Sequence, residues 1–148
     1  MNIQMHIDVR EYISEETSVE RLRKALYLSM VKMKEIAMRK APVDLGGLKA
    51  GIAQGLSPNT KNSDTYTLED GVEYGLYVEY GTSPHWVPIK PLIEWAMRHG
   101  GDKGFAYAIQ HKIAKYGMNA HPFFRPAFYE VKEKWIPFFF NKAMEGAL

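Results

Sequence analysis

The sequence contains no cysteine among its 148 residues. Without thiols the chain can form neither a disulfide framework nor a zinc–thiolate site, and it has no cysteine nucleophile. A chain of this length can bury roughly 70% of the surface that its unfolded form exposes, so it needs no cross-link to fold. We therefore expect one globular domain covering residues 1–148, and the lack of thiols agrees with a reducing cytoplasm.

Long apolar runs are absent as well. No stretch approaches the roughly 18 consecutive apolar residues that a transmembrane helix needs. The first residues, "MNIQMHIDVREY", have neither the basic start nor the apolar run of a signal peptide. The sequence therefore predicts a soluble protein with no membrane partner.

Charge is nearly balanced, and the net charge of +2 is too small to argue for nucleic acid by itself. Its distribution is uneven, because basic residues dominate between residues 18 and 40 and acidic residues dominate between residues 61 and 82. Two solvated faces are the simpler interpretation, but copies of the chain could also pair through these surfaces. The candidate contact residues are Arg21, Arg23, Lys24, Asp64, Glu69 and Asp70, with Glu79 at the end of the acidic stretch.

A long amphipathic helix is the element that the sequence predicts best. Apolar residues recur at helical spacing from Val19 to Ala37, which leaves most of the basic residues on the exposed side. Thr17 and Glu20 form a capping-box pattern, so the helix should begin there. Pro42 should stop it, because the residue before a proline is disfavoured in the helical conformation.

Short segments with alternating polarity predict strands. "NIQMHIDV" near the N-terminus has the period of a half-buried strand. "GIAQGLS", "TYTLED" and "GVEY" are separated by turn-forming residues and predict an antiparallel meander. We therefore expect an α+β fold, in which a small antiparallel sheet is crossed by the long N-terminal helix and further helices follow towards the C-terminus.

Two helices are predicted in the middle of the chain, in "IKPLIEWAMRHGG" and "DKGFAYAIQHKIAKYG". Gly100 and Gly117 suit their C-terminal ends. The first helix gathers five apolar residues on one face: Ile89, Leu92, Ile93, Ala96 and Met97. The second places four residues on one side: Phe105, Ile109, Ile113 and Tyr116.

A last helix is predicted to begin near Pro126. Pro137 must kink or end it, because a proline inside a helix removes a hydrogen bond and clashes with the previous turn. The run of phenylalanines at residues 138–140 cannot all face one side of a helix. At least one of these rings should be exposed, which hints at a partner surface.

We find no pattern that predicts catalysis, a metal site or a cofactor site. The histidines His6, His85, His99, His111 and His121 lack the paired spacing of a zinc site. There is no G-x-S-x-G elbow, and the glycines of "YGLYVEYG" do not match a dinucleotide-binding pattern. The sequence therefore predicts a protein that is not an enzyme.

Three separated segments resemble a known family. "APVDLGGLKAGI" at residues 41–52 resembles A-P-V-D-T-G-x-L-(K/R)-x-S-I, "YGLYVEYGT" at residues 74–82 resembles Y-A-x-Y-V-E-(Y/F)-G-T, and "AHPFFRPAF" at residues 120–128 resembles A-x-P-F-L-R-P-A. In this order, after an amphipathic helix, they resemble the head–tail connector or tail-completion proteins of long-tailed bacteriophages, also called minor tail or neck proteins. Leu45 stands where the family usually has Thr, and Gly51 where it often has Ser.

The resemblance implies a structural virion protein that acts in several copies around the axis where head meets tail. Its partners would be copies of itself and other connector, neck or tail proteins, with DNA only passing through the channel. It would reside in the virion, and in the host cytoplasm during assembly. A tail terminator or another minor tail component remains open, as does a nucleic-acid-binding module that uses the basic helix at residues 18–40.

The motifs also predict local structure. Asp44 should cap the turn that follows the long helix, and Tyr74 to Gly81 should form one helical turn ending at a glycine. Arg125 is the expected cation for Glu79 or Asp44, and the first V-E-Y-G is interpreted as a coincidence beside the second. The structural-motif residues are Asp44, Gly46, Tyr77, Glu79, Tyr80, Gly81, Thr82, Pro122, Phe123, Arg125 and Pro126.

Overall fold

The computed structural model describes residues 5–8, 19–58 and 65–148. These residues divide into two compact units. Unit 1 comes from Met1–Leu76 and Pro122–Leu148, and unit 2 is Tyr77–His121. A compact unit is not by itself a domain that folds alone, so the expectation of one domain over residues 1–148 stays a prediction.

Helix α1, Val19–Lys40, runs through unit 1. Its predicted apolar stripe is confirmed, because every stripe residue except the exposed Val19 is buried. The helix ends two residues before Pro42, as the sequence predicts. Thr17, the proposed capping residue, lies outside the described residues. The buried stripe residues are Leu22, Leu26, Met30, Met33, Ile36 and Ala37.

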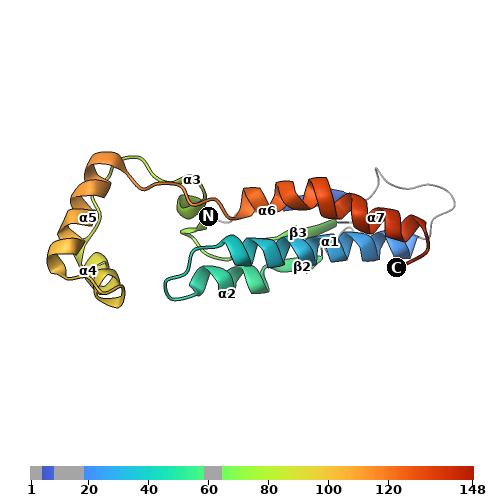
Figure 1. Ribbon diagram of the computed structural model, residues 1–148, viewed down its shortest axis with the longest axis horizontal. Helices are drawn as coiled ribbons and strands as arrows, with labels where there is room; N and C mark the ends of the chain where they lie inside the picture. Colours follow the sequence, from blue (N-terminus) through green and yellow to red (C-terminus); the bar gives the residue numbers. More distant parts are fainter. Residues whose placement is uncertain (1–4, 9–18, 59–64) are drawn as a thin grey trace. The chain divides into compact units, whose positions relative to one another are not determined.

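The C-terminal helices α6, Phe124–Glu130, and α7, Ile136–Met144, lie alongside α1 (Figure 1). Between them the chain forms a π-helical turn, η2, Val131–Trp135, in which the N–H of Ile136 donates to the carbonyl of Val131. Pro137 therefore falls in the first turn of a new helix, where a missing N–H costs little. The predicted interruption is confirmed and takes the form of a π turn, while the helix begins two residues before the predicted Pro126.

The sheet of unit 1 has three antiparallel strands in the order β1-β3-β2. They are β1, Met5–Asp8, β2, Leu56–Pro58, and β3, Thr65–Leu68. Leu68 of β3 lies opposite both Met5 and Leu56 and is fully buried. Helix α1 contacts β2 and β3, so the α+β prediction, with the long helix packed on a small antiparallel sheet, is confirmed.

Two parts of the predicted meander are wrong. "GIAQ" belongs to helix α2, Gly47–Gln54. "GVEY" lies outside the sheet and leads into the short helix α3, Gly75–Tyr80. The strand at the N-terminus takes the place in the sheet that the meander prediction gave to "GVEY".

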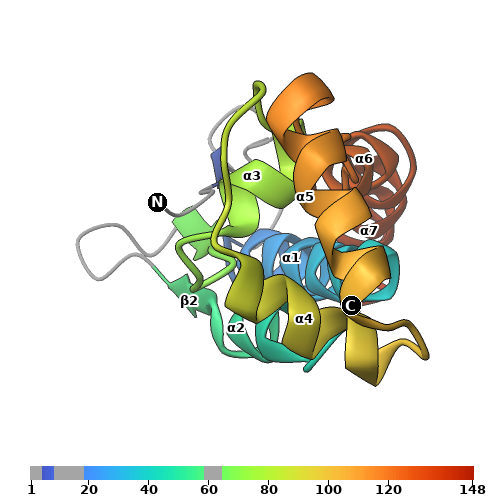
Figure 2. The ribbon, with the colours of Figure 1, turned by 90° about the vertical axis from the view of Figure 1, so that its left-hand side faces the viewer.

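Unit 2 contains a hairpin of two helices, α4, Ile89–Arg98, and α5, Lys103–Tyr116 (Figure 2). Gly100 has a φ of 78° in the turn between them, and Asp102 caps α5 by accepting a hydrogen bond from the N–H of Phe105 at 2.8 Å. Both helices were predicted from the sequence.

The predicted buried side of α5 is only partly correct. Ile113 is buried, but Phe105 and Tyr116 are 47% and 65% exposed. The buried residues of α5 are Ala106, Gln110 and Ile113. The helix therefore turns a smaller face towards its neighbours than its apolar pattern predicts.

Candidate functional site

Helix α2 packs through a face made of glycines. Gly47, Gly51 and Gly55 are spaced four residues apart and so lie on one side of the helix. A Cβ at Gly51 would overlap the carbonyl oxygen of Asp70, and one at Gly55 would overlap the carbonyl oxygen of Glu69. The N–H of Glu69 donates to the carbonyl of Gly55 at 3.1 Å. The helix thus lies with its backbone directly against the chain that follows β3, which leaves no room for the Ser of the family pattern at position 51.

Asp70 organises the loop that precedes α3. It is fully buried, and its Oδ1 accepts a hydrogen bond from the N–H of Val72 at 3.3 Å. Its carboxylate lies against Gly75, where a Cβ would overlap Oδ2. The first V-E-Y-G therefore ends in a glycine that the packing requires, while its interpretation as a coincidence beside the second stays a prediction.

The second V-E-Y-G ends in Gly81, which follows α3 and has a φ of 73°. Its N–H donates to the carbonyl of Tyr77 at 2.8 Å and closes the short helix. A Cβ at Gly81 would lie 2.9 Å from the backbone nitrogen of Ala120, closer than real side chains come. The predicted helical turn ending at a glycine is confirmed.

Thr82 joins the two ends of unit 2. Its N–H donates to the carbonyl of Met118 at 3.0 Å, and the N–H of Met118 lies 3.2 Å from the Thr82 carbonyl and 3.1 Å from Thr82 Oγ1. The N–H of His121 donates to the carbonyl of Val78 at 2.8 Å. His85 Nδ1 lies 2.8 Å from the carbonyl of Ser83 and adds a contact within the same turn. The motif residues thus hold the start and the end of unit 2 together.

The first and third motifs contribute side chains of different exposure. Asp44 is exposed in the loop between α1 and α2, and the N-cap of α2 is Gly46, with a φ of 82° and no side chain to cap the helix. The predicted role of Asp44 as the cap of the turn after α1 stays a prediction. Arg125 is exposed and Glu79 is fully buried. The pairing of Arg125 with Glu79 or Asp44 also stays a prediction.

The aromatic residues of the motifs divide between core and surface. Phe123 and Phe124 are fully buried, with their rings edge to face and 5.8 Å between centroids. Tyr77 and Tyr80 are about half exposed, at 53% and 54%. Beside the two phenylalanines, Pro122 is exposed and Pro126 is half-buried.

The predicted acidic contact surface is wrong for two of its residues. Asp70 and Glu79 are fully buried, so neither can meet a neighbouring subunit at the surface. Glu69 is half-buried, and Asp64 lies outside the described residues. A sequence shows the sign of a charge but not whether the charged group is buried. Asp70 is buried in a loop, where its carboxylate accepts a hydrogen bond from the N–H of Val72.

The basic surface of α1 is present at the start of the helix. Arg21 and Lys24 are exposed and Arg23 is half-buried. Their role as contacts between subunits stays a prediction.

Further along α1, the cations lie beside carboxylates. Lys32 donates to Glu35 at 2.8 Å, and this hydrogen bond holds the pKa of the Glu35 carboxyl below its ordinary value. Arg39 and Lys40 lie 4.0 and 3.9 Å from Glu130 of α6. This half of the helix is therefore a mixed surface rather than a basic one.

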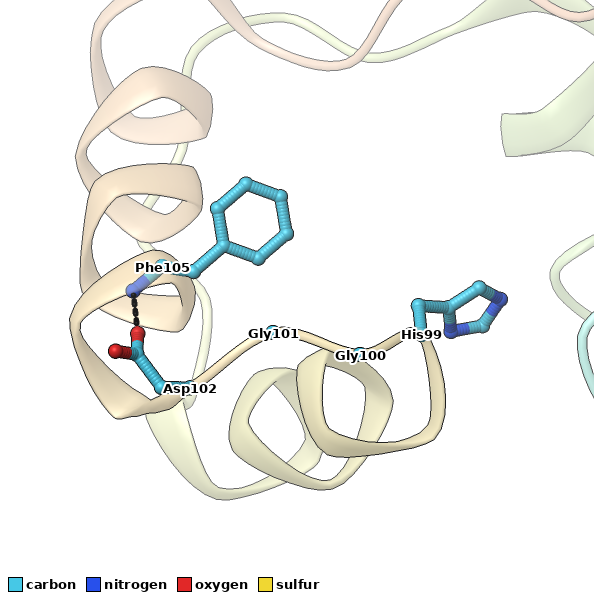
Figure 3. Close-up of a pocket in the computed structure, with 5 residues that line it drawn as sticks. All are labelled: His99, Gly100, Gly101, Asp102 and Phe105. Atoms are coloured by element: carbon cyan, nitrogen blue, oxygen red, sulfur yellow. Dashed lines mark hydrogen bonds between the residues drawn. The ribbon is translucent and has the colours of Figure 1, made fainter.

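A depression of about 470 Å³ lies at the turn between α4 and α5 (Figure 3). Its polar groups serve the ends of the helices: Asp102 accepts from the N–H of Phe105, and His99 Nδ1 lies 2.9 Å from the carbonyl of Trp95. The His99 ring also stacks on Trp95 at 4.4 Å. The residues that line the depression are His99, Gly100, Gly101, Asp102 and Phe105.

The described residues contain neither a candidate metal site nor a helix that could span a membrane. In the part of the chain that the structure describes, no three His, Cys, Asp or Glu side chains gather as metal ligands would. Each helix in the same part is too short or too polar to span a bilayer. No family model, curated protein or solved structure matches the chain.

Proposed function

We propose that the chain is a structural protein of a long-tailed bacteriophage that assembles in several copies at the head–tail junction, as a connector or tail-completion protein. It has no catalytic role and needs no cofactor. Its partners are further copies of the chain and other connector, neck or tail proteins, and DNA only passes through the channel that they surround.

The observation that carries the proposal is the structural use of the three motifs. Ile52 of the first motif and Phe123 of the third are fully buried, and Gly81 of the second closes α3 beside Met118. Residues that recur in a family because they fix a fold suit an assembly protein, whereas catalytic motifs hold reactive side chains in a cleft. These contacts support the resemblance at the residues that define it.

Exposed apolar side chains support the same function. Leu45, Met97, Tyr116 and Trp86 are between 64% and 78% exposed. Large contiguous apolar patches on a soluble protein mark surfaces that partners cover, and exposed side chains of this size are the material from which such a patch is built. In an assembly around an axis, adjacent copies would meet head to tail through two different surfaces, and the rotation between them would close a ring.

The test is deletion of the reading frame from its parent phage or prophage, followed by electron microscopy of the induced lysate. The expected result is heads and tails lying apart, and the length of the tails then shows which side of the junction the protein serves. Complementation with the wild-type chain must restore joined particles. Normal, infectious particles from the deletion strain would contradict the proposal.

A variant refines this test at the start of α1. Reversal of three charges, Arg21→Glu, Arg23→Glu and Lys24→Glu, should weaken complementation and make it depend on salt if this surface contacts a neighbour. Reversal of the exposed Lys132 and Lys134 of η2 is the matched control. Equal complementation by the wild-type chain and the α1 variant would show that this surface does not contact a neighbouring subunit.

Binding of nucleic acid through α1 is the alternative that the same experiments separate. It predicts affinity for free DNA that falls steeply with salt, in proportion to the number of phosphates neutralised. The carboxylates beside Lys32, Arg39 and Lys40 leave a shorter basic surface than the sequence predicts, so we favour assembly.

A further inference from the structure

Helix α5 is bordered by the irregular segment that connects α3 to α4 (Figure 2). We call residues 82–87 of this segment the strap. Hydrogen bonds attach the strap at three points: Thr82 pairs with Met118, the N–H of His85 donates to the Ile113 carbonyl at 3.3 Å, and Gln110 Nε2 donates to the Val87 carbonyl at 2.7 Å. Residue numbers rise along the strap as those of its partners fall, so the strap runs antiparallel to the C-terminal half of α5.

The strap comes closest to its partners at Thr82. The N–H of Met118 lies 3.2 Å from the Thr82 carbonyl and 3.1 Å from Thr82 Oγ1, so the hydroxyl adds to the backbone pairing. Gly117, with a φ of 75°, ends α5 at this point, and a Cβ there would overlap the Thr82 carbonyl oxygen. A residue without a side chain is therefore required for the two backbones to approach this closely.

Hydrogen bonds hold the strap more than apolar burial does. Residues 83–86 are exposed, and Trp86 is 64% exposed. The hydrogen bond from the N–H of Met118 to Thr82 Oγ1 also lies at the surface. Segments with few buried apolar contacts and with solvent-exposed hydrogen bonds open locally, at a lower free energy than global unfolding. The strap has both properties.

The strap contacts two of the buried residues of α5. Gln110 is 4% exposed and Ile113 is 7% exposed. Gln110 donates to the strap through its side chain, and Ile113 accepts from it through its carbonyl. If the strap leaves, both groups can hydrogen-bond to water instead, so the net cost of losing each bond is small.

Two prolines stiffen the strap. Pro84 lies within it, and Pro88 follows it directly. Each proline fixes its own φ and restricts the residue before it, Ser83 or Val87, to extended conformations. A stiff segment has little freedom to detach one residue at a time, so we expect its three attachments to break together.

We propose that the strap is a conformational device of unit 2, which releases from α5 as one piece while the helices of unit 2 and the core of unit 1 stay folded. Release breaks the attachments at Thr82, His85 and Val87 together and opens the face of α5 around Ile113 to water. The device belongs to unit 2 alone and does not rest on the head–tail role.

Native-state hydrogen exchange of the full-length chain tests the release, because the N–H groups of Thr82, His85 and Met118 are all bonded when the strap is attached. These amides should share one opening free energy, lower than that of the helical amides of α5. Their exchange should depend only weakly on urea, because release exposes little surface. Exchange of these amides only through global unfolding, together with the slowest amides of α1, would overturn the proposal.

A substitution at one end of the strap tests whether it moves as one piece. Gln110→Met removes the bond to Val87 and keeps a similar side-chain volume. It should speed exchange of the Met118 N–H, at the other end, about threefold to tenfold, as expected for one lost hydrogen bond. Lys112→Met, at an exposed position of the same helix, is the matched control and should leave this rate unchanged. Wild-type exchange at Met118 in Gln110→Met would contradict release in one piece.

Two substitutions at Thr82 separate the hydroxyl from the shape of the side chain. Thr82→Val keeps the branched shape and removes the hydroxyl, so exchange of the His85 N–H should become about threefold to tenfold faster. Thr82→Ser keeps the hydroxyl and should exchange at close to the wild-type rate. Equal rates at His85 in the two variants would count against the attachment at Thr82.

A disulfide can hold the strap reversibly. Thr82 and Met118 exchange both backbone hydrogen bonds, so their Cα atoms are expected about 5.5 Å apart, within the range of a disulfide. The double variant Thr82→Cys with Met118→Cys has no other cysteine. Its oxidation should slow exchange of the His85 N–H tenfold or more, and reduction should reverse the change, while the slowest amides of α1 serve as the internal control. Equal exchange at His85 in the oxidised and reduced forms would overturn the proposal.

Discussion

The two compact units differ most in their cores. In unit 1, α1 packs against α6 and α7 with large side chains fully buried, including Met30, Met33, Phe123 and Phe124. In unit 2, the buried apolar side chains are Ala96, Ala106 and Ile113, and rings such as those of Trp86 and Tyr116 lie at the surface. Unit 1 uses large apolar side chains for its own core, whereas unit 2 leaves several of them exposed.

This difference indicates where the stability of the fold resides. Hydrophobic burial grows with the apolar area removed from water, so the folding free energy of the chain comes largely from unit 1. Unit 2 is held by local hydrogen bonds, such as those between Thr82 and Met118, and by the packing of α4 against α5.

The largest effect is expected in the core of unit 1. Phe124→Ala removes a fully buried ring and should lower the free energy of unfolding by about 3–5 kcal/mol. Tyr129→Ala, on the same helix but 56% exposed, should change it by less than about 0.5 kcal/mol. Urea unfolding followed by circular dichroism measures both, and similar losses from the two variants would break the comparison.

A smaller loss of unfolding free energy is expected from a substitution where α2 meets the chain after β3. Gly51→Ser adds a side chain where a Cβ would overlap the Asp70 carbonyl, so the backbone must move, at a cost of about 1–3 kcal/mol. Ala50→Ser is the control, because residue 50 is exposed on the same helix and adds only a hydroxyl. If Gly51→Ser is as stable as Ala50→Ser in the same urea titration, the close approach of the two backbones does not hold.

In unit 2, loss of its one large buried aliphatic side chain should act locally. Ile113→Ala should speed hydrogen exchange of the α4 and α5 amides and leave the slowest amides of α1 unchanged, because α1 has its own core. The global free energy of unfolding should fall by less than about 0.5 kcal/mol. An equal loss of protection in α1 would instead show that residues 1–148 unfold as one cooperative domain, which is the expectation from the sequence.

The smallest effect concerns the Lys32–Glu35 pair on the surface of α1. Since the folded-state pKa of Glu35 is lowered by Lys32, the ionised carboxylate favours folding at neutral pH, and this contribution disappears as pH falls through that pKa. Glu35→Gln should therefore unfold at a slightly lower temperature than the wild type at neutral pH. In acid the two melting temperatures should coincide, and a difference that persists there would point to packing rather than charge.

The regular elements of this fold follow from the sequence, because periodicity reports them directly. The stripe of α1, the stop before Pro42 and the interruption at Pro137 all came from local rules of spacing and proline geometry. These rules did not predict helix α2, because glycines at positions 47, 51 and 55 lower helix propensity and are typical of turns. The structure explains these glycines, because the backbone of Glu69 and Asp70 lies directly against them.

The candidate site was predicted only in part, because local sequence patterns do not show contacts that are made through loops. The resemblance pointed to Gly81 and Thr82, which hold unit 2 together, but it did not find Asp70 or Gly75. Their contact joins residues five apart through a loop whose geometry no periodicity encodes. The repeated four-residue spacing of the α2 glycines was the one signal in the sequence that could have indicated a close approach.

The π turn between α6 and α7 has a consequence for aligning this chain with others. Buried residues step by three or four positions along these helices except from Val131 to Ile136, where the step is five. The extra residue keeps both halves facing α1. A protein with one residue fewer at this point could present the same apolar face on an unbroken helix. Correct alignment would then require a single-residue gap inside a helix, where alignments seldom place one.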